Sequence, residues 1–490
     1  MTTRWIFGDQ LGPQFVDDAG QRVLMIEARG VFARKRFHRA KAHLVLSAMR
    51  HRAAELGERC SYIRADSYTA ALAGIDAPLS VCRPTSRAAL AFVEASGIQL
   101  LPARGFATST ADFERWADSR GRRRLLMEDF YRDSRRRLDV LMDGDEPVGG
   151  RWNFDADNRK GPPRSTTLGV PDPWWPQEDE IDHEVRQDLD RWERDGQVAF
   201  IGSDGPRRFA ATRDEALAAL DHFITTRLPQ FGPYEDAMMS GDAWMAHSLL
   251  SAPMNLGLLD PMEVVVRAED SFHRGEAPLA SVEGLIRQVI GWREFIWHLY
   301  WHFPASYRDM NELDATEPVP DWFADLDTEA VDAACLAATL KDVRDIGWVH
   351  HIPRLMILGN YALQRGWDPG QVTDWFHRAF VDGYDWVMVP NVVGMSQYAD
   401  GGLLATKPYA AGGAYISRMS NYCVDCRYDP KKRVGADACP FTAGYWAFLD
   451  RNREQLAANH RLAQPLSGLR RLTDLDELLE QETARGSSPP

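Results

Sequence analysis

The chain has 490 residues, a formal net charge of -14 and 44% apolar residues. Its length suggests about three domains, and its apolar content is enough for sizeable cores. No apolar run approaches the ~20 residues that cross a bilayer. The first residues enter a strand-like segment without a basic region, so the sequence predicts neither a membrane span nor a signal or transit peptide. The negative charge argues against a generally basic, nucleic-acid-binding coat, although it allows a local basic face.

The six cysteines indicate the compartment in which the chain works. In a large chain without a predicted signal peptide they fit a reducing cytoplasm, where thiols bind metals instead of forming disulfides. The sequence therefore predicts a cytoplasmic protein, and we expect a monomer without membrane contact.

The first 115 residues alternate short apolar runs with helical stretches. The pattern predicts two helices, at 38–56 and 85–95, and five strands, at 5–7, 23–26, 61–63, 79–82 and 98–101. Such alternation is typical of a parallel α/β sheet. The segment has no G-x-G-x-x-G and no Walker loop, which weakens any dinucleotide or nucleoside triphosphate hypothesis.

Polar residues follow the first two predicted strands. Asp9 and Gln10 come just after the first strand, and Glu27 ends the second. In open parallel sheets ligands bind at the carboxyl ends of the strands, so these side chains could line a crevice. The alternative is simple turn chemistry, for which Gly-Asp is a common choice.

A basic segment at 115–138 contains nine arginines and four acids. One interpretation is a solvated, salt-bridged helix surface. The next stretch, 149–165, mixes glycine and proline with cations and an aromatic ring, among them Arg151, Trp152, Arg159 and Lys160. Aromatic groups between cations in a shaped loop suit phosphate contacts beside a stacking or wedging group. The loop is therefore a candidate DNA or RNA contact.

The rest of the chain is mostly helical. Residues 171–180 are rich in proline, which indicates an extended linker. A capping box at 212–215 opens the first predicted helix beyond it. We divide the chain into an α/β domain (1–115), a basic segment and linker (116–210), a helical domain (211–475) and a partly disordered tail (476–490).

Residues 281–301 are apolar nearly all round, which predicts a buried helix. Gly284, Arg287, Gly291 and Glu294 fall along one stripe of it. Each glycine costs about 1 kcal/mol relative to alanine in a helix interior. The glycines could open a groove in which Arg287 reaches an anion and Glu294 anchors it. Close helix packing around an internal Arg–Glu pair explains them equally well.

Two further segments carry candidate ligand contacts. His350 and His351 stand at a predicted helix start, with Arg354 and Asn360 on the following turns. They could be a proton donor and ligand contacts, although a histidine is more often a satisfied core residue. Residues 386–402 mix polar and apolar residues broken by proline and glycine, which predicts a binding loop.

Four cysteines form a candidate metal site. Cys423, Cys426 and Cys439 lie in C-x2-C-x12-C-P, and Cys335 lies 88 residues upstream. Four soft thiolates predict zinc or an iron–sulfur cluster, and the spacing alone leaves both open. Trp375 and Trp386 bracket the approach to the 386–402 segment; core packing is the ordinary interpretation of such rings, and electron hopping is the functional one.

Together these segments resemble the iron–sulfur bacterial cryptochromes and photolyases, the prokaryotic (6-4) photolyases. The resemblance runs in order from the first strand to about residue 470. It rests on the cysteine array and on SAMRH (47–51), GGRWNFDADNR (149–159), EGLIRQVIGWREF (283–295), HHIPRLM (350–356), PNVVGMSQYADGG (390–402) and TKPYAAGGAYI (406–416).

The resemblance implies an α/β antenna domain followed by an all-helical flavin domain. It also implies three cofactors: FAD, a [4Fe-4S] cluster on the four cysteines, and 6,7-dimethyl-8-ribityllumazine as antenna. Asp9, Gln10 and Glu27 match the antenna pocket. The positions that match FAD-contacting segments are Ser248, Ser251, Arg287, Glu294, Arg354, Asn360, Asp382 and Asn391.

The resemblance further implies light-dependent repair of (6-4) photoproducts in UV-damaged DNA by photoexcited reduced FAD. His351, with His350 beside it, matches the histidine that protonates the lesion. Tyr409 and the 151–160 loop match the DNA-facing side, and Trp375 and Trp386 are the candidate electron-transfer residues. The alternatives are a blue-light photoreceptor and a non-photochemical iron–sulfur protein that binds DNA.

One segment and two single positions depart from the family pattern. The stretch before Cys335 lacks the family's W-T-G-x-T-x-M-x-C, so the usual end of the electron-transfer route is missing, and Trp322 is a candidate substitute. Phe376 stands where some relatives have tyrosine. Met388 stands where relatives can carry a glutamate facing the flavin, which should alter the reduced flavin form that is stabilised.

Overall fold

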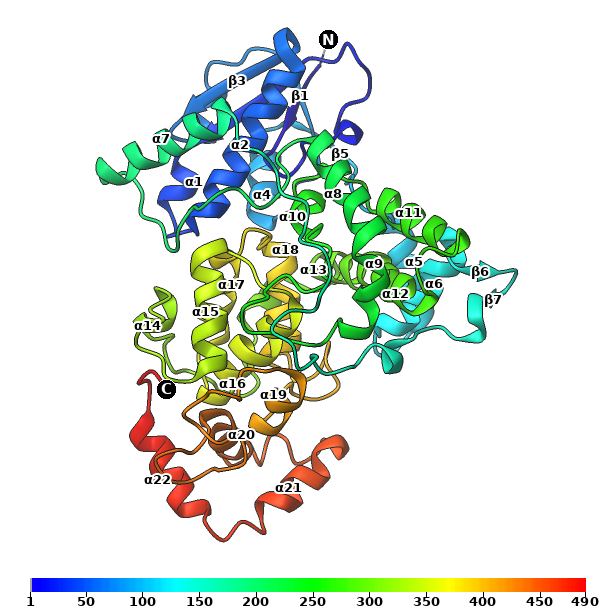
Figure 1. Ribbon diagram of the computed structural model, residues 1–490. Helices are drawn as coiled ribbons and strands as arrows, with labels where there is room; N and C mark the ends of the chain where they lie inside the picture. Colours follow the sequence, from blue (N-terminus) through cyan, green and yellow to red (C-terminus); the bar gives the residue numbers. More distant parts are fainter. Residues whose placement is uncertain (1) are drawn as a thin grey trace.

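The structure is a computed structural model that describes residues 2–490. An α/β domain lies at one end of a larger helical body (Figure 1). Its five parallel strands are β1 (Thr3–Ile6), β2 (Val23–Ala28), β3 (Cys60–Ala65), β4 (Leu79–Cys82) and β5 (Gln99–Leu101), in the order β3-β2-β1-β4-β5. All five predicted strands are confirmed, as is the parallel sheet. The strand order reverses between β1 and β4: β2 and β3 are added on one side of β1, and β4 and β5 on the other. Parallel sheets of this kind bind ligands at such a switch point.

Alternate strand residues bury themselves on opposite faces of the sheet, because successive side chains of a strand point to opposite sides. Ile6, Val23 and Met25 pack with α2 (Arg39–Leu56). Trp5 and Leu24 pack on the other face, which is covered by α3 (Tyr68–Leu72) and α4 (Arg87–Ala95); the short α1 (Gly30–Ala33) follows β2. The helix α7 (Glu180–Arg194) packs along α2, so the chain returns to this domain after residue 179.

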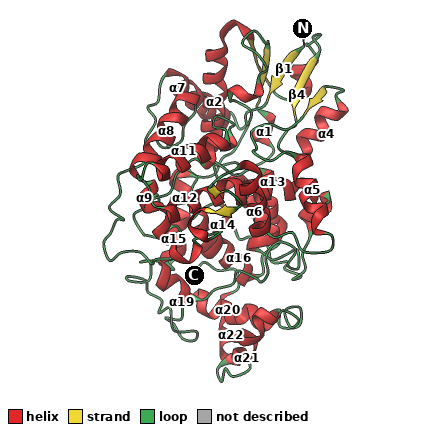
Figure 2. Cartoon of the chain, turned by 90° about the vertical axis from the view of Figure 1, so that its right-hand side faces the viewer, coloured by secondary structure: helices red, strands yellow, loops and turns green. Residues whose placement is uncertain are grey.

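The helical body contains most of the remaining chain (Figure 2). Its helices are α5 (Thr110–Arg120), α6 (Met127–Leu138), α8 (Arg213–Thr226), α9 (Leu228–Phe231), α10 (Ser251–Asn255), α11 (Pro261–His273), α12 (Leu279–Ile286), α13 (Glu294–His302), α14 (Asp321–Ala324), α15 (Ala334–Ile346), α16 (Asn360–Arg365), α17 (Pro369–Ala379), α18 (Asp385–Val389), α19 (Gly413–Met419), α20 (Pro440–Arg451), α21 (Ala463–Leu469) and α22 (Leu475–Arg485). A hairpin of β6 (Met142–Asp143) and β7 (Glu146–Pro147) follows α6. The capping box predicted at Thr212 is present at the start of α8. The domain boundaries given above stay predictions.

Three segments are π-helical: Arg287–Arg293, Pro353–Gly359 and Pro390–Ser396. The first joins α12 to α13, so the predicted buried helix at 281–301 is confirmed with a widened middle. The third shows that the loop predicted at 386–402 is wrong for its first half. Pro390 follows α18 directly and lies inside a continuous helix, where it removes one backbone hydrogen bond without ending the helix. Single π-turns are frequent at functional sites.

The two glycines of the 281–301 helix serve close packing. A Cβ at Gly291 would lie 3.2 Å from Met127 Sδ and 3.3 Å from Tyr131 Cδ2, and one at Gly284 would lie 2.9 Å from Asn158 Nδ2. The interpretation as a groove is therefore wrong for both. The predicted pair of Arg287 with Glu294 is also absent. The Glu294 carboxylate instead accepts a hydrogen bond from Arg293 Nη1 at 3.3 Å.

The end of the chain is packed, which differs from the disorder expected for it. The residues of α22 form a helix, and the Ser487 carbonyl accepts a hydrogen bond from the Trp322 indole at 2.8 Å. The Pro490 carbonyl accepts from the amides of Asp332 and Ala333 at 2.6 and 2.9 Å. None of the helices in residues 2–490 has the length and apolar content of a membrane-spanning segment.

Glu294 should give the protein a measurable pH dependence. Burial raises the pKa of Glu294 to about 6, and the nearby Arg293 only partly opposes this. Because the folded pKa exceeds the unfolded one, the folded state binds more protons across the interval, and stability falls as pH rises through it. In Glu294→Gln this loss should be absent. We expect the unfolding free energy of the wild type, relative to the variant, to fall by about 2 kcal/mol between about pH 4 and pH 7 in urea titrations. A constant difference would contradict the assignment.

Candidate active site

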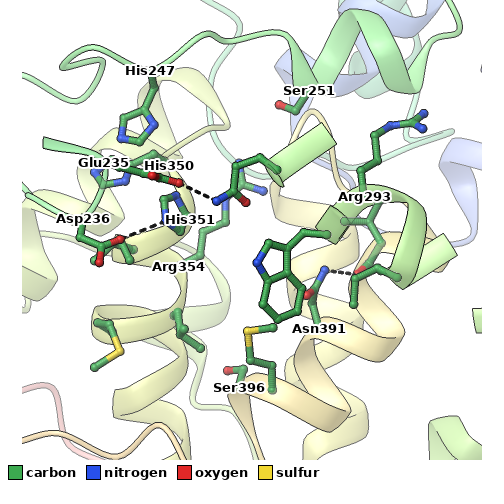
Figure 3. A pocket seen from close by; sticks show the side chains of 18 of the residues that line it. Glu235, Asp236, His247, Ser251, Arg293, His350, His351, Arg354, Asn391 and Ser396 are labelled. Atoms are coloured by element: carbon green, nitrogen blue, oxygen red, sulfur yellow. Dashed lines mark hydrogen bonds and ion pairs between the residues drawn. The ribbon is translucent and has the colours of Figure 1, made fainter. Parts of the chain in front are cut away.

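A cavity of about 990 Å³ lies inside the helical body. It is walled by α6, α10, α18 and the three π-helical segments, which contribute residues such as Met127, Ser251, Arg287, Leu355 and Asn391. Figure 3 shows the side chains that converge on it. Its volume is at the upper end for small-molecule sites, which suits a large cofactor or a cofactor together with a substrate.

Most residues predicted to contact a ligand line this cavity: Ser248, Ser251, Arg287, His350, His351, Arg354, Asp382, Trp386, Met388, Asn391, Arg159 and Tyr409. Glu294, Asn360 and Trp375 do not. Glu294 accepts a hydrogen bond from the Thr108 amide at 2.9 Å behind the wall. Asn360 is buried and bonds both backbone groups of Ala411, so it supports the wall instead of facing the cavity.

An ion pair fixes one side of the cavity. Arg354 donates to both carboxylate oxygens of Asp382 at 2.9 and 3.0 Å, and the Ser251 hydroxyl donates to the same carboxylate at 2.7 Å. The turn that carries Asp382 is held by Asn255, which donates to the Asp382 carbonyl, and by Lys41 of α2. The buried Lys41 ammonium donates to the carbonyls of His377 and Gly383, so the α/β domain reaches the cavity wall directly.

Arg287 lies among three carboxylates on the cavity wall. Its guanidinium lies 3.4 Å from Glu283, 3.5 Å from Asp155 and 3.8 Å from Glu235. Its Nε and Nη2 atoms are nevertheless buried without a hydrogen-bond partner in the described residues. Buried donors of this kind ordinarily have partners. These two atoms face Glu283 and Glu235, so the Arg287 side chain lines the cavity as part of an acidic cluster.

Three histidines meet beside Arg354 (Figure 3). The rings of His247 and His350 stack with centroids 4.1 Å apart, and His351 lies edge-on at 5.8 Å from each. Burial, together with the neighbouring His351, lowers the pKa of both His247 and His350 well below the usual range. These two imidazoles are therefore neutral near pH 7.

His351 is the histidine that can reach a substrate. Its side chain is 46% exposed, and its Nε2 lies 3.5 Å from Asp236 Oδ1 (Figure 3). Burial would raise the pKa of Asp236, but the hydrogen bond and the positive charge of His351 lower it overall.

Sequence reasoning missed His247 and Asp236. The only sequence signal for His247 is its position next to Ser248, and Asp236 carries no motif at all. The ligand atoms of the three histidines lie within 4.8 Å of one another. The near-parallel rings of His247 and His350, however, direct their lone pairs side by side, which does not suit a single metal ion.

The two candidate electron-transfer tryptophans have different positions. Trp386 lines the cavity, and its ring lies 5.6 Å from that of Trp297. Trp375 lies behind the cavity-lining Phe376 and packs on Phe323 at 4.5 Å. From Phe323 the rings continue through Trp367 at 4.7 Å to the half-buried Trp322, 6.2 Å further.

The four predicted metal ligands come together. Cys335, Cys423, Cys426 and Cys439 line one small cavity between α15, α19 and α20. Burial and the three neighbouring thiols raise the pKa of Cys335. A Cβ at Gly413 would lie 2.8 Å from Cys439 Sγ, so glycine leaves room for the sulfur there. The donor set fits a thiolate-bound metal centre.

Two of the predicted antenna residues, Asp9 and Gln10, lie at the switch point of the sheet, whereas Glu27 lies near the end of β2, on the other side of β1 from β4. Gln10 donates to the Cys82 carbonyl at 3.0 Å, and Glu27 is bonded twice by Arg50 and once by Tyr62. Asp9 accepts from Thr85, but its Oδ1 is buried without a partner in the described residues. Burial raises the pKa of Asp9. Of the three, Asp9 retains an acceptor for a ligand.

Comparison with known proteins agrees with this geometry. A family model described as deoxyribodipyrimidine photo-lyase-related protein matches residues 4–197. A (6-4) photolyase of Agrobacterium fabrum is 43% identical over 499 aligned residues, covering 96% of this chain and 95% of that relative. The chain belongs to the bacterial (6-4) photolyase family.

Solved structures of photolyases and cryptochromes share the fold. A bacterial class III photolyase from Agrobacterium tumefaciens gives a TM-score of 0.56 at 15% identity, covering 99% of this chain and 97% of that one. A cryptochrome from Synechocystis gives 0.51 at 11% identity, with 80% and 82% covered. Membership of the photolyase family implies that the chain binds a flavin.

The Asp382–Arg354 ion pair on the cavity wall should contribute strongly to the unfolding free energy of the protein. Asp382→Asn leaves a half-buried guanidinium without its counter-ion, and we expect a loss of about 3 kcal/mol in unfolding free energy. Arg354→Met should cost a similar amount. The double variant should cost clearly less than the sum, because both halves of one interaction are removed. Urea unfolding of the four proteins tests this, and additive effects would show that the two residues act independently.

Proposed function

We propose that this chain is a light-dependent enzyme that repairs pyrimidine-pyrimidone (6-4) photoproducts in UV-damaged DNA. The observation that carries the proposal is the half-exposed His351, paired with Asp236, on the wall of a cavity large enough for a cofactor and a flipped lesion. The relative named (6-4) photolyase, similar over almost the whole chain, supports repair over a purely signalling role.

FAD is the cofactor that we assign to the cavity. The residues that would hold it are Ser248, Ser251, Arg287, Arg354, Asp382 and Asn391, which line the cavity, with Met388 beside them. The volume of the cavity and the position of Arg287 on its wall support this assignment. Bound there, FAD would supply light-driven one-electron chemistry.

The lesion has to leave the duplex to enter this cavity. Damaged bases are the least costly to flip, which contributes to selectivity. Arg159 and Tyr409 at the cavity are the proposed DNA contacts there, with Arg151 and Lys160 outside it. His351 then acts as the proton donor to the flipped lesion. The neutral His350 and His247 behind it hold its ring in place and exclude water.

Two further cofactors belong to the proposal. We assign a [4Fe-4S] cluster to Cys335, Cys423, Cys426 and Cys439, and 6,7-dimethyl-8-ribityllumazine to the crevice at Asp9, Gln10 and Glu27. The convergence of the thiols supports the cluster, and the free acceptor of Asp9 supports a ligand at the sheet. Trp375 and Trp386 are the proposed electron carriers.

The test of the function is repair of an oligonucleotide with one defined (6-4) photoproduct under blue light with a reductant. Restoration of this lesion, but not of a cyclobutane dimer, is the expected result. Intact flavin absorbance without repair of either lesion would favour a photoreceptor. Absence of flavin and lumazine bands would favour a non-photochemical DNA-binding protein.

His351→Ala should remove the proton donor without disturbing the fold, because the side chain is half exposed. We expect repair to fall by about 10²–10⁴-fold, the usual contribution of a positioned acid, while flavin absorbance per chain stays unchanged. His183→Ala, at an exposed position of α7, is the matched control. Repair that persists in the His351 variant would contradict the assignment.

Metal analysis distinguishes the candidates for the thiol site. A [4Fe-4S] cluster predicts about four iron and four sulfide per chain, whereas zinc predicts about one metal ion without sulfide. Cys426→Ala should reduce the metal content and yield insoluble protein, since the site joins α15, α19 and α20. Cys60→Ala on β3 should leave both metal content and solubility intact.

A further inference from the structure

The helix α6 carries a basic stripe that begins at the cavity. Glu128 lines the cavity, and Arg132 and Arg136 follow it at spacings of four residues, so the three share one helix face. Eight residues at 1.5 Å rise place Arg136 about 12 Å along the helix from Glu128. The stripe therefore leads away from the cavity-lining Glu128 along α6, the helix labelled in Figure 1.

Arg132 and Arg136 are both exposed. Neither has a carboxylate partner among residues 2–490. Other arginines of the same segment are paired, as in Arg120–Asp129 and Arg137–Asp133. The acid at the head of the stripe, Glu128, is engaged by Asn153 at 3.0 Å. The two guanidiniums thus keep their donors for an external anion.

The ring of Trp152 positions these two side chains. The Arg136 guanidinium lies over it at 4.5 Å and that of Arg132 at 5.9 Å. A third, Arg135, approaches the ring at 5.3 Å and is itself buried, donating to the Trp152 carbonyl. Cation–π contact restricts the arginines without consuming their N–H groups.

This arrangement changes the role expected for Trp152. The sequence suggested a stacking or wedging group for a base, but the half-buried ring is covered by guanidiniums. Trp152 is therefore a platform that orders two arginines in advance. Ordering them beforehand reduces the entropy lost when they bind.

We infer that Arg132 and Arg136, ordered on Trp152, form a binding site for the sugar–phosphate backbone of duplex DNA outside the cavity. The inference rests on the proposed function, because the DNA is the same one whose lesion enters the cavity. At 3.4 Å per base pair, the distance of about 12 Å between Glu128 at the cavity and Arg136 corresponds to three to four base pairs of duplex. Arg122 and Arg123 are exposed in the turn before α6.

The test is the salt dependence of binding to undamaged duplex, measured in the dark so that repair does not enter. Arg132→Gln with Arg136→Gln should reduce the slope of log affinity against log salt by about 1.8, or 0.9 for each phosphate. The control is Arg22→Gln with Arg194→Gln, two exposed positions of the α/β domain, which should leave the slope unchanged. A slope for the α6 variant equal to that of the control would overturn the inference.

Two further measurements locate the contact. The first uses lesion duplexes that end about two base pairs from the lesion, on one side or on the other. When the missing side is the one that α6 covers, the double variant should bind as tightly as the wild type. If the double variant still binds more weakly than the wild type on both shortened duplexes, the inference is overturned. Trp152→Leu should weaken damaged and undamaged duplex by the same factor. A loss confined to damaged duplex would show that Trp152 contacts the lesion instead.

Discussion

Asp382 carries its charge almost completely out of water, and the cavity depends on how that charge is compensated. Two hydrogen bonds from Arg354 and one from Ser251 satisfy its carboxylate, while Asn255 holds its backbone. A buried charge with fewer partners would be strongly destabilising. Three separate parts of the chain must therefore be in place before this wall can form. Lys41 adds a fourth, since it ties α2 to the same turn.

Burial divides the three cavity histidines into two kinds. His247 and His350 are enclosed and lose the ability to carry a proton, whereas His351 keeps access to the cavity and a carboxylate partner. The same side chain is thus a neutral, buried spacer in two positions and the proposed proton donor in the third. Environment, and not residue type, makes this distinction.

The sequence predicted what local patterns encode. The five strands, the capping box at Thr212 and the convergence of the four cysteines follow from short-range periodicity or from ligand chemistry. It failed where tertiary contacts decide. Glu294 and Asn360 share a stripe or a turn with cavity residues, yet both face the packing behind the wall. Trp152 looked like a free aromatic group because the guanidiniums that cover it come from a helix that precedes it in the chain. Asp236 has no motif, and it becomes a candidate only because the turn that follows α9 meets the histidines in the fold.

The path of the chain between the two parts of the molecule has a consequence for biosynthesis. After β5 the chain enters the helical body as α5 and α6, and then returns to lay α7 along α2 before leaving again. The sheet alone is finished at residue 101, but its outer helix is not made until residue 194. A ribosome must therefore produce part of the second unit before the first is complete. Neither unit can be excised with a single cut, and the exposed side of α2 needs protection from association with other chains until α7 arrives.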